Sequence, residues 1–342
     1  MSDLPEIAVL LARDHPARSL ERRARQGELT RVGRGSYAAE PPGTEVERRV
    51  ALARAWIAVT AARLDDGVIF SHASAALLWD LPTLVVPDRT HVIQRYRPGG
   101  RNDPHLFRHV MRIDRAEWTT LLGRRVTTLE RTVVDCACSM SSAGALVIAD
   151  AALRAGADPE VIAALVRSRR GARGVAGARL VCARADAGAE SPGETLTRLR
   201  LLDAGLAVPT TQIAVATHAG RFRIDLGWPE HRVGIEFDGR VKYSGLFGRA
   251  PVDALIQEKR REDALREAGW TLLRVTWQDL RGGEPLAARA RRLLRRAEFG
   301  TSARSSAARV PMSGRMYRTG RPDGGGAPGG GGARAGGVGG GT

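Results

Sequence analysis

The sequence predicts an α/β protein (α+β overall) made of several parts, and three observations support this prediction. Stretches in which apolar and polar residues alternate, as in strands, are interspersed with longer stretches of helical periodicity. With 342 residues, 43% of them hydrophobic, the chain can bury more than one core. From residue 299 onward it consists mostly of Gly, Ala, Arg and Ser, which cannot offset the entropy of ordering. We therefore expect a folded body followed by a disordered Gly/Arg-rich tail at residues 299–342.

The first forty residues predict a small DNA-binding unit. A short apolar stretch before Asp14 predicts one helix, and Ser19 is positioned to cap a second helix, which Gly27 ends. The residues up to Tyr37 predict two strands joined by a glycine-containing turn. Two helices followed by a hairpin are typical of a winged helix, which we assign to residues 1–40.

The arginines of this unit are candidates for DNA contacts. The chain has a formal net charge of +16, which favours a polyanionic partner such as DNA. In a winged helix, one helix usually approaches the major groove and the hairpin contacts phosphates. The expected contacts are Arg18, Arg22, Arg23, Arg31 and Arg34. The alternative is a small helical cap with a solvated basic face.

Two stretches in the middle of the chain carry a family resemblance. Residues 71–82 read SHASAALLWDLP, and residues 131–137 read RTVVDCA. Together with the Gly-x-Tyr that ends the amino-terminal hairpin, they resemble the AbiEi-type antitoxins of toxin–antitoxin systems, over about residues 4–183. The resemblance implies a DNA-binding regulator, with operator DNA or a toxin protein as its partner, and a middle domain at residues 44–183.

The pattern of this middle domain predicts mixed helices and strands. Helices are expected at residues 45–64, 71–79 and 128–153, and strands at residues 84–86, 91–93 and 106–107. An Arg- and Gly-rich stretch at residues 167–177 predicts a connection between domains.

The histidines and cysteines of the chain give no clear metal or redox motif. His72, beside Ser71, is interpreted as a helix-start residue that hydrogen-bonds locally, not as a catalytic base. His105 and His109 are four residues apart but lack an obvious Cys or acidic partner, which makes a metal site there a weak expectation. The three cysteines provide no disulfide framework, and no signal peptide or membrane-spanning run is present. We expect a cytoplasmic protein without membrane partners.

A predicted hairpin with three carboxylates is the most informative stretch of the sequence. Two alternating runs, around Ile224 and around Ile235, are separated by a Trp-Pro-Glu-His segment. Because successive side chains point to opposite faces of a strand, Asp225, Glu236 and Asp238 should all lie on the polar face. Clustered carboxylates repel one another unless a cation lies among them, and oxygen ligands of this kind suit Mg²⁺. The sequence therefore predicts a Mg²⁺ (or Mn²⁺) site formed by these three residues.

The two lysines of the chain accompany this hairpin. Lys242 and Lys259 are the only lysines among 53 basic residues, and both follow the predicted carboxylates closely. An ammonium is a compact donor whose pKa can shift, whereas a guanidinium stays protonated. A chain that otherwise uses arginine therefore keeps lysine where a compact donor is useful.

The arrangement Asp225, strand, Glu236-x-Asp238-Gly resembles the restriction-endonuclease-like core, in particular the very-short-patch-repair endonucleases, over residues 184–297. In the wider family a lysine stands in place of Asp238, and this branch often has a histidine in place of Lys242. The resemblance implies a metal-dependent endodeoxyribonuclease, a hydrolase in which Lys242 or Lys259 assists the attacking water.

The remaining elements of this part follow the α-β-β-β-α-β order that the resemblance implies. Helices are expected at residues 191–204, 253–267 and 284–296, and a buried strand at residues 271–276. Glu194 in the first of these helices has two interpretations, and both stay open. The resemblance makes it an acidic residue beside the metal, while Ser191-Pro192-x-Glu194 is also a helix-capping sequence.

Two functions follow from these patterns. The leading one is a DNA-binding protein with a Mg²⁺-dependent endonuclease-like domain that cuts phosphodiester bonds. The alternative is a non-catalytic, antitoxin-like transcriptional regulator that uses the nuclease fold to bind DNA or a partner. A third candidate is an adaptor that holds a partner protein and leaves the acidic face without metal.

Overall fold

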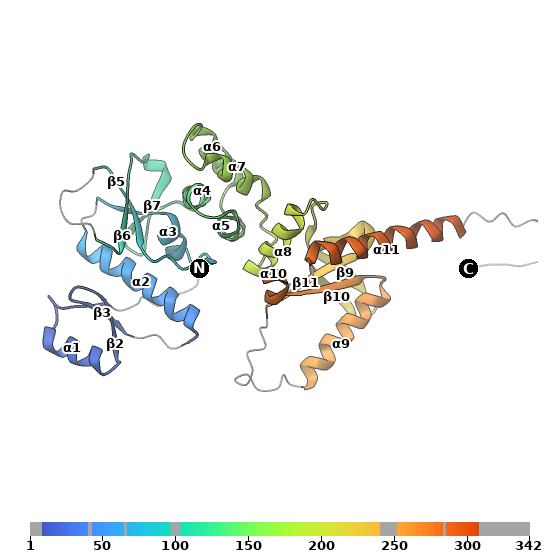
Figure 1. The fold of residues 1–342 in the computed structure, drawn as a ribbon, viewed down its shortest axis with the longest axis horizontal. Coiled ribbons are helices and arrows are strands. Elements are labelled where there is room, and N and C mark those ends of the chain that lie inside the picture. The colour runs from blue at the N-terminus through green and yellow to red at the C-terminus, as the bar shows by residue number, and fades with distance from the viewer. Residues whose placement is uncertain are drawn as a thin grey trace, which may run out of the picture. The chain divides into compact units, whose positions relative to one another are not determined.

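The structure, a computed structural model, describes residues 9–39, 43–64, 67–96, 103–239, 252–282 and 285–307 (Figure 1). It confirms the predicted α/β class, because helices accompany three separate sheets along the chain. None of the helices in these ranges is long and apolar enough to cross a membrane. Lys242 lies outside the described residues.

The amino-terminal part is a three-stranded antiparallel sheet with one helix, in the sheet order β1-β3-β2. Its elements are β1 (Val9–Leu11), α1 (Ala17–Arg25), β2 (Leu29–Gly33) and β3 (Ser36–Ala39). The helix predicted before Asp14 is wrong over its described part, because Val9–Leu11 is a strand that pairs with β3. A run this short gains more from an existing sheet edge than from a helix that must first nucleate. The two-helix unit expected for a winged helix is therefore not formed by the described residues.

The ends of α1 test two further expectations. The helix begins after Pro16 with no side-chain cap, so the expected Ser19 cap is wrong. Pro16 occupies the N-cap position, and its carbonyl accepts from the N–H groups of Ser19 and Leu20, so Ser19 lies within the first turn. Gly27 ends the helix as predicted, with a φ of 76°. Leu20 faces inward and packs with Leu29 and Tyr37.

Helix α2 (Glu45–Arg63) and the second sheet follow. Thr44 begins α2 with a capping box closed by Glu47, and the helix matches its predicted range. The second sheet has the order β6-β5-β4-β8-β7. Its strands and the elements between them are β4 (Ile69–Phe70), α3 (His72–Leu78), β5 (Thr90–Gln94), β6 (Leu106–Val110), η1 (Arg115–Glu117), β7 (Trp118–Leu121) and β8 (Arg124–Thr127).

Strands β5 and β6 contain the strands predicted at residues 91–93 and 106–107. The strand predicted at residues 84–86 is wrong, because these residues form a bend. Pro82 and Pro87 flank this short apolar run and each lacks a backbone donor.

Four helices then pack around one apolar core: α4 (Leu129–Ser139), α5 (Ser142–Arg154), α6 (Pro159–Ser168) and α7 (Val175–Arg184). The single helix predicted at residues 128–153 is two helices, since Met140 is extended and Ser141 caps α5. The expected inter-domain connection at residues 167–177 is wrong as well. It is a turn between α6 and α7, and Val166 and Val175 on either side belong to the same core.

The carboxy-terminal part has a four-stranded sheet in the order β12-β11-β10-β9. Its elements are α8 (Pro192–Asp203), β9 (Thr210–Thr217), β10 (Gly220–Trp228), η2 (Pro229–His231), β11 (Val233–Asp238), α9 (Val252–Glu267), β12 (Thr271–Thr276), α10 (Trp277–Arg281) and α11 (Leu286–Ala307). The predicted hairpin is confirmed, because β10 and β11 pair antiparallel, while β11 and β12 pair parallel. Helix α11 continues to Ala307, into the first residues of the predicted tail. The residues there include Ala and Arg, which favour helix. The rest of the predicted tail lies outside the described residues.

A buried ion pair joins α5 to α8. Both carboxylate oxygens of Asp150 accept hydrogen bonds from Nη2 of Arg198, at 3.0 and 2.8 Å. Thr195 and the backbone N–H of Asp186 donate to the same carboxylate at 2.9 Å each. Asp150 is 1% exposed and Arg198 is 2% exposed. Burial raises the pKa of Asp150, and Arg198 acts in the opposite direction by favouring the ionised carboxylate.

Candidate functional site

Three carboxylates from three elements come together in the carboxy-terminal part. Glu194 lies in the first turn of α8, Asp225 on β10 and Glu236 on β11. The charges of Glu194 and Glu236 both raise the pKa of Asp225, which shows that the three groups interact. We call these three residues the acidic site.

Glu194 is held rigidly at the start of α8. Its Oε1 accepts from the Ser191 hydroxyl at 2.8 Å, and its Oε2 accepts from the Glu190 N–H at 2.8 Å. Gln212 on β9 also donates to Oε2, at 3.1 Å. Ser191 in turn accepts from the Glu194 N–H, which confirms the Ser191 half of the predicted capping sequence. The Glu194 carboxylate accepts from the Glu190 N–H one residue before the cap, and at the same time it contributes charge to the acidic site.

A glycine allows α8 to approach the sheet this closely. A Cβ on Gly193 would lie 1.9 Å from the ring of Phe237, the residue that follows Glu236 on β11. Only a residue without a side chain fits there, because real Cβ atoms do not approach a ring carbon this closely. The first turn of α8 therefore packs directly against β11, which brings Glu194 to the site.

Asp225 is the carboxylate with the most strongly perturbed pKa in this site. Its Oδ2 accepts from the backbone N–H of Phe237 at 2.8 Å. Burial raises the pKa of Asp225 to about 6, with further upward contributions from Glu194 and Glu236. The Phe237 hydrogen bond and Arg261 act in the opposite direction without cancelling the effect. Ionisation of Asp225 beside Glu194 and Glu236 is therefore unfavourable unless a cation compensates the added negative charge.

Glu236 is paired with an arginine that sequence analysis missed. Both Glu236 oxygens accept from Arg261 of α9, one of them at 3.2 Å, and Arg261 also donates to the Arg223 carbonyl at 2.9 Å. Arg261 lies three and four residues before the buried Ala264 and Leu265, a helical spacing that places all three on the inward face of α9. This spacing was the signal that could have identified Arg261.

Lys259, the lysine expected near the carboxylates, does not lie there. Its side chain is 78% exposed, and its ammonium lies 4.0 Å from Asp263 on the same helix. Two positions along an α-helix differ by about 200° around the axis. Lys259 therefore faces away when Arg261 faces the sheet, and the structure does not bring Lys259 to the carboxylates.

The other expected residues of this site have different outcomes. Asp238 is half-buried at the end of β11, opposite Thr276 of β12, and lies on the same side of the strand as Glu236. Lys242 falls outside the described residues, so its predicted role is neither supported nor contradicted by the fold.

The acidic site has a formal imbalance of charge. Arg261 is the basic group that lowers the pKa of Asp225, against upward shifts from Glu194 and Glu236. Arg261 is shared with Glu258, 3.6 Å away, so among the described residues the carboxylates around this guanidinium outnumber it. The three carboxylates do not converge on one point, because Glu194 and Glu236 are held by hydrogen bonds to different partners. A metal ion at Glu236 would compete with Arg261 for the carboxylate oxygens.

The raised pKa of Asp225 predicts a pH dependence of stability in the absence of divalent metal. Between pH 3.8, the ordinary pKa of aspartate, and about 6, the folded chain keeps a proton that the unfolded chain has released. The free energy of unfolding should therefore fall as the pH rises through this window and level off above it. Urea denaturation in EDTA should show this fall in the wild-type stability minus that of Asp225→Asn, because the buried histidines shift the stability of both proteins alike. A wild-type-to-variant difference that stays constant from pH 4 to 7 would contradict the assignment.

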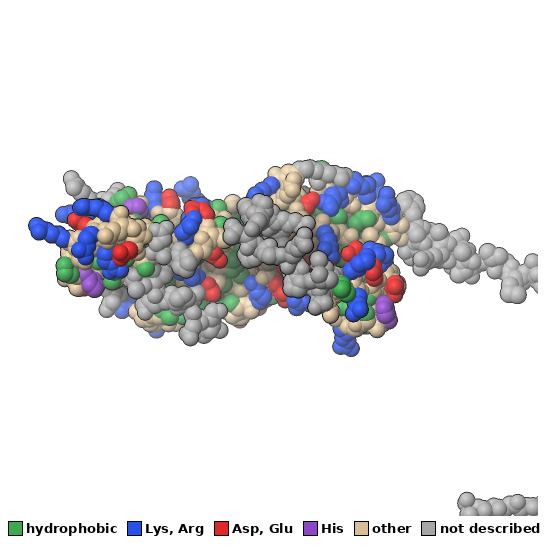
Figure 2. Space-filling model, turned by 90° about the horizontal axis from the view of Figure 1, so that it is seen from below, with side chains coloured by type: hydrophobic (Ala, Val, Ile, Leu, Met, Phe, Trp, Pro, Cys, Tyr) green, Lys and Arg blue, Asp and Glu red, His purple; other side chains and the backbone are tan. Residues whose placement is uncertain are grey.

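The amino-terminal arginines are mostly available to a partner. Arg18, Arg22, Arg31 and Arg34 are exposed, whereas Arg23 is half-buried and donates to Glu28 at 2.9 Å. On the face drawn in Figure 2, basic side chains are spread widely, with acidic side chains among them. The positive charge of the chain is thus not confined to α1 on this face.

A group of three histidines that the sequence analysis did not predict lies where α3 meets β5 and β6 of the second sheet. The local hydrogen bond predicted for His72 is confirmed, since its Nδ1 lies 2.9 Å from the Ser71 hydroxyl oxygen. His105 stacks on Trp56, with ring centroids 3.8 Å apart. His109 instead meets His91 and His72, which come from distant positions in the sequence. His91 has no neighbour in the sequence that could have signalled this group.

Comparisons with known proteins identify relatives of this chain. No protein-family model matches it. It is 32% identical over 290 residues to the uncharacterized proteins Rv2248 and MT2308 of two Mycobacterium tuberculosis strains, covering 82% of this chain and 97% of each relative. The crystal structure of the RV2827C protein from Mycobacterium tuberculosis aligns with 60% of this chain and 79% of that one, at 18% identity. Its TM-score of 0.31 is too low to support any inference. By its identity and coverage, the chain belongs to the same protein family as Rv2248 and MT2308 of Mycobacterium tuberculosis.

Proposed function

We propose that the chain is a DNA-binding protein whose carboxy-terminal part hydrolyses DNA phosphodiester bonds with Mg²⁺ (or Mn²⁺). The observation that carries this proposal is the charge of the acidic site. The charges of Glu194 and Glu236 act on Asp225, whose pKa rises to about 6, and among the described residues Arg261 opposes this shift. A perturbed carboxylate of this kind marks a candidate functional site. The element order α8-β9-β10-β11-α9-β12 also matches the α-β-β-β-α-β order implied by the resemblance to restriction endonucleases.

The proposed roles follow from the geometry of the acidic site. When bound, the metal polarises the scissile phosphate and lowers the pKa of a water molecule. Asp225 and Glu236 are the proposed ligands, with Asp238 or the Phe237 carbonyl as further oxygen donors. Glu194 stays fixed by its own hydrogen bonds and keeps the site negative.

Arg261 has a separate role in this proposal. It competes with a cation for Glu236, because it now donates to both Glu236 oxygens. A planar guanidinium binds phosphate oxygens as readily as carboxylate oxygens. Arg261 displaced from Glu236 is therefore placed to contact the DNA phosphate at the site.

DNA binding by the amino-terminal part gives a direct prediction. Arg22→Ala should weaken duplex binding and lower the log–log salt slope by about 0.9, since the exposed Arg22 is a proposed phosphate contact. Arg184→Ala is a suitable control, because it removes the same charge from an arginine that is already paired with Asp203. Fluorescence anisotropy at several salt concentrations measures both slopes. Equal slopes for Arg22→Ala and the wild type would place the DNA contacts elsewhere.

The cleavage activity itself can be tested with the purified full chain. We expect it to cut supercoiled, linear or single-stranded DNA in Mg²⁺ or Mn²⁺, and to lose this activity in EDTA. Failure to cut any of these substrates with either metal rejects the catalytic proposal.

A second candidate function is an antitoxin-like transcriptional regulator that binds operator DNA or a toxin protein without cleaving DNA. Two observations favour it. Arg261 already pairs with Glu236, and the exposed Lys259 side chain points away from the acidic site. An uncleaved, sequence-specific complex with the DNA upstream of its own gene would support this function if cleavage fails.

A further inference from the structure

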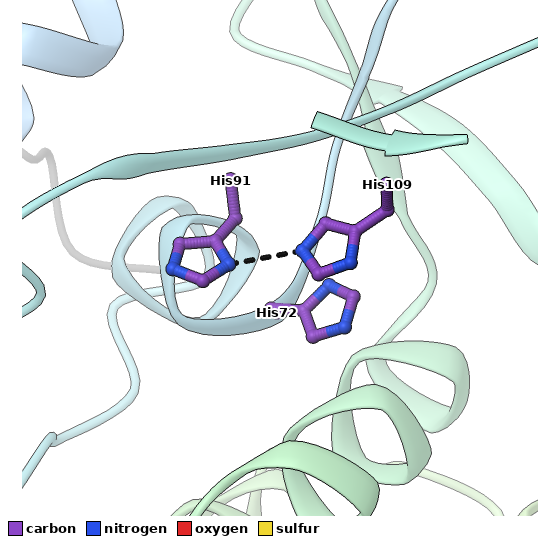
Figure 3. Close-up of side chains that lie close together, drawn as sticks. All are labelled: His72, His91 and His109. Atoms are coloured by element: carbon purple, nitrogen blue, oxygen red, sulfur yellow. Dashed lines mark hydrogen bonds between the residues drawn. The ribbon is translucent and has the colours of Figure 1, made fainter. Parts of the chain in front are cut away.

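His72, His91 and His109 come from three different elements and meet at one edge of the second sheet (Figure 3). His91 lies on β5 and pairs in parallel register with Phe107 of β6. Paired residues in neighbouring strands share a face, and so do residues two positions apart along one strand. His109, two residues after Phe107, therefore lies on the same face as His91.

The third histidine is brought to this face by the start of α3. The Ser71 N–H donates to the His91 carbonyl at 3.1 Å, and the His91 N–H donates to the Ser74 hydroxyl at 2.8 Å. These two bonds fix α3 to β5. His72, the first residue of α3, has a φ of 54°, which is unfavourable for a residue with a side chain. The strained backbone directs the His72 ring onto His109, with ring centroids 3.7 Å apart.

The nitrogen atoms of the three rings are close to a chelating arrangement. Nδ1 of His91 lies 3.0 Å from Nε2 of His109, and one ligand atom from each of the three rings lies within 4.8 Å of the others. Two nitrogens bound to tetrahedral Zn²⁺ at 2.0–2.1 Å are separated by about 3.3 Å. The His91–His109 pair is therefore near that spacing already, and His72 reaches it by turning its ring out of the stack.

The surroundings keep the imidazoles neutral, which is the form that binds metal. Burial lowers the pKa of His72 and of His109 to about 3, and it also lowers the pKa of His91. His72 holds Nδ1 against the Ser71 hydroxyl, which leaves its Nε2 as the ligand atom. Hydrogen bonds of this kind fix the orientation of metal-binding histidines.

The charged groups around the three rings include an unsatisfied acceptor. Arg131 on α4 donates to Asp135 at 2.8 Å and to Glu117, and Arg169 lies 3.4 Å from Asp135. Asp135 is 5% exposed, and its Oδ2 is buried without a hydrogen-bond partner among the described residues. Its charge acts on His109, so the unsatisfied carboxylate lies near the rings. Buried acceptors are rarely left without a partner, and a bound ion is one recognised explanation.

We propose that His72, His91 and His109 form a binding site for one Zn²⁺ ion, separate from the acidic site. Three imidazoles suit a borderline-soft transition metal better than Mg²⁺ or Mn²⁺, which prefer oxygen ligands. Three protein ligands leave a fourth position open for water or for the Asp135 carboxylate. The alternative is that the three rings form only a packed aromatic cluster with Phe107.

The test uses the full chain, stripped of metal and titrated with Zn²⁺ against a chromogenic chelator. We expect one Zn²⁺ per chain in the wild type. Ser71→Ala should weaken binding by about 10–100-fold, as loss of a partner that orients a ligand does. His91→Gln and His109→Gln should each weaken it further, while His105→Gln and His218→Gln should bind like the wild type.

Co²⁺ substitution identifies the ligand atoms. The site should give visible absorption typical of nitrogen and oxygen ligands, without a thiolate charge-transfer band. If the wild-type protein takes up no Zn²⁺, the proposal is overturned. This outcome can be read whether or not the histidine variants fold. So does equal binding by folded His91→Gln and His105→Gln, or a thiolate band, which would assign the metal to Cys138 or Cys182 instead.

Discussion

Glu236→Gln should abolish DNA cleavage in Mg²⁺, with a loss of at least about 10²–10³ in rate, while duplex binding persists. The amide can neither hold a divalent cation as a carboxylate does nor form the two-oxygen pair with Arg261. Binding should survive because the substitution removes one negative charge and leaves the exposed arginines of α1 intact. Plasmid nicking and anisotropy, measured on the same preparation, separate the two effects.

The lysines provide the matched controls for this experiment. Lys259→Arg should cleave like the wild type, because the Lys259 side chain is 78% exposed and faces away from the acidic site. Lys242→Arg should cleave poorly if Lys242 supplies the donor that the sequence predicts, since guanidinium is not a compact donor. If Glu236→Gln cleaves DNA at the wild-type rate, the reaction does not occur at the acidic site.

Asp150→Ala should lower the free energy of unfolding by about 3–5 kcal/mol, because it leaves Arg198 charged and buried without its partner. The same substitution removes the acceptor for Thr195 and for the Asp186 N–H. Urea denaturation followed by circular dichroism measures the loss.

Two further variants show whether the buried charge is the cause of this loss. Asp203→Ala removes an exposed pair with Arg184 and should cost only about 0–1 kcal/mol. Asp150→Leu combined with Arg198→Met should recover much of the lost stability, since no charge is then buried alone. A loss below about 1 kcal/mol for Asp150→Ala would show that solvent reaches the pair.

Local patterns predicted much of the carboxy-terminal fold. The alternation around Ile224 and Ile235 predicted the β10–β11 hairpin, and Ser191 with Pro192 predicted the start of α8. Both signals are contained within a few residues, so no distant contact is needed to produce them. The Val9–Leu11 run was assigned to the wrong element because its pairing partner is β3, which follows later in the chain.

The candidate sites were harder to predict than the strands that carry them. Asp225 and Glu236 were identified because strand periodicity fixes their face. The role of Arg261 depends on which side of α9 packs on the sheet, and choosing lysine by residue type led to Lys259 instead. The three histidines depend on the β5–β6 register and on where α3 begins, and neither is visible in local sequence.

The ion pair between α5 and α8 also limits how this chain could be recombined during evolution. Leu199 of α8 belongs to the same core as α4–α7, and Arg198 beside it depends on Asp150. A carboxy-terminal part transferred to another protein at residue 184 would leave Asp150 behind and keep a buried guanidinium with no counterion. We therefore expect an exchange of the carboxy-terminal part to preserve stability only if α5 is transferred together with α8, or if both charged residues are replaced together.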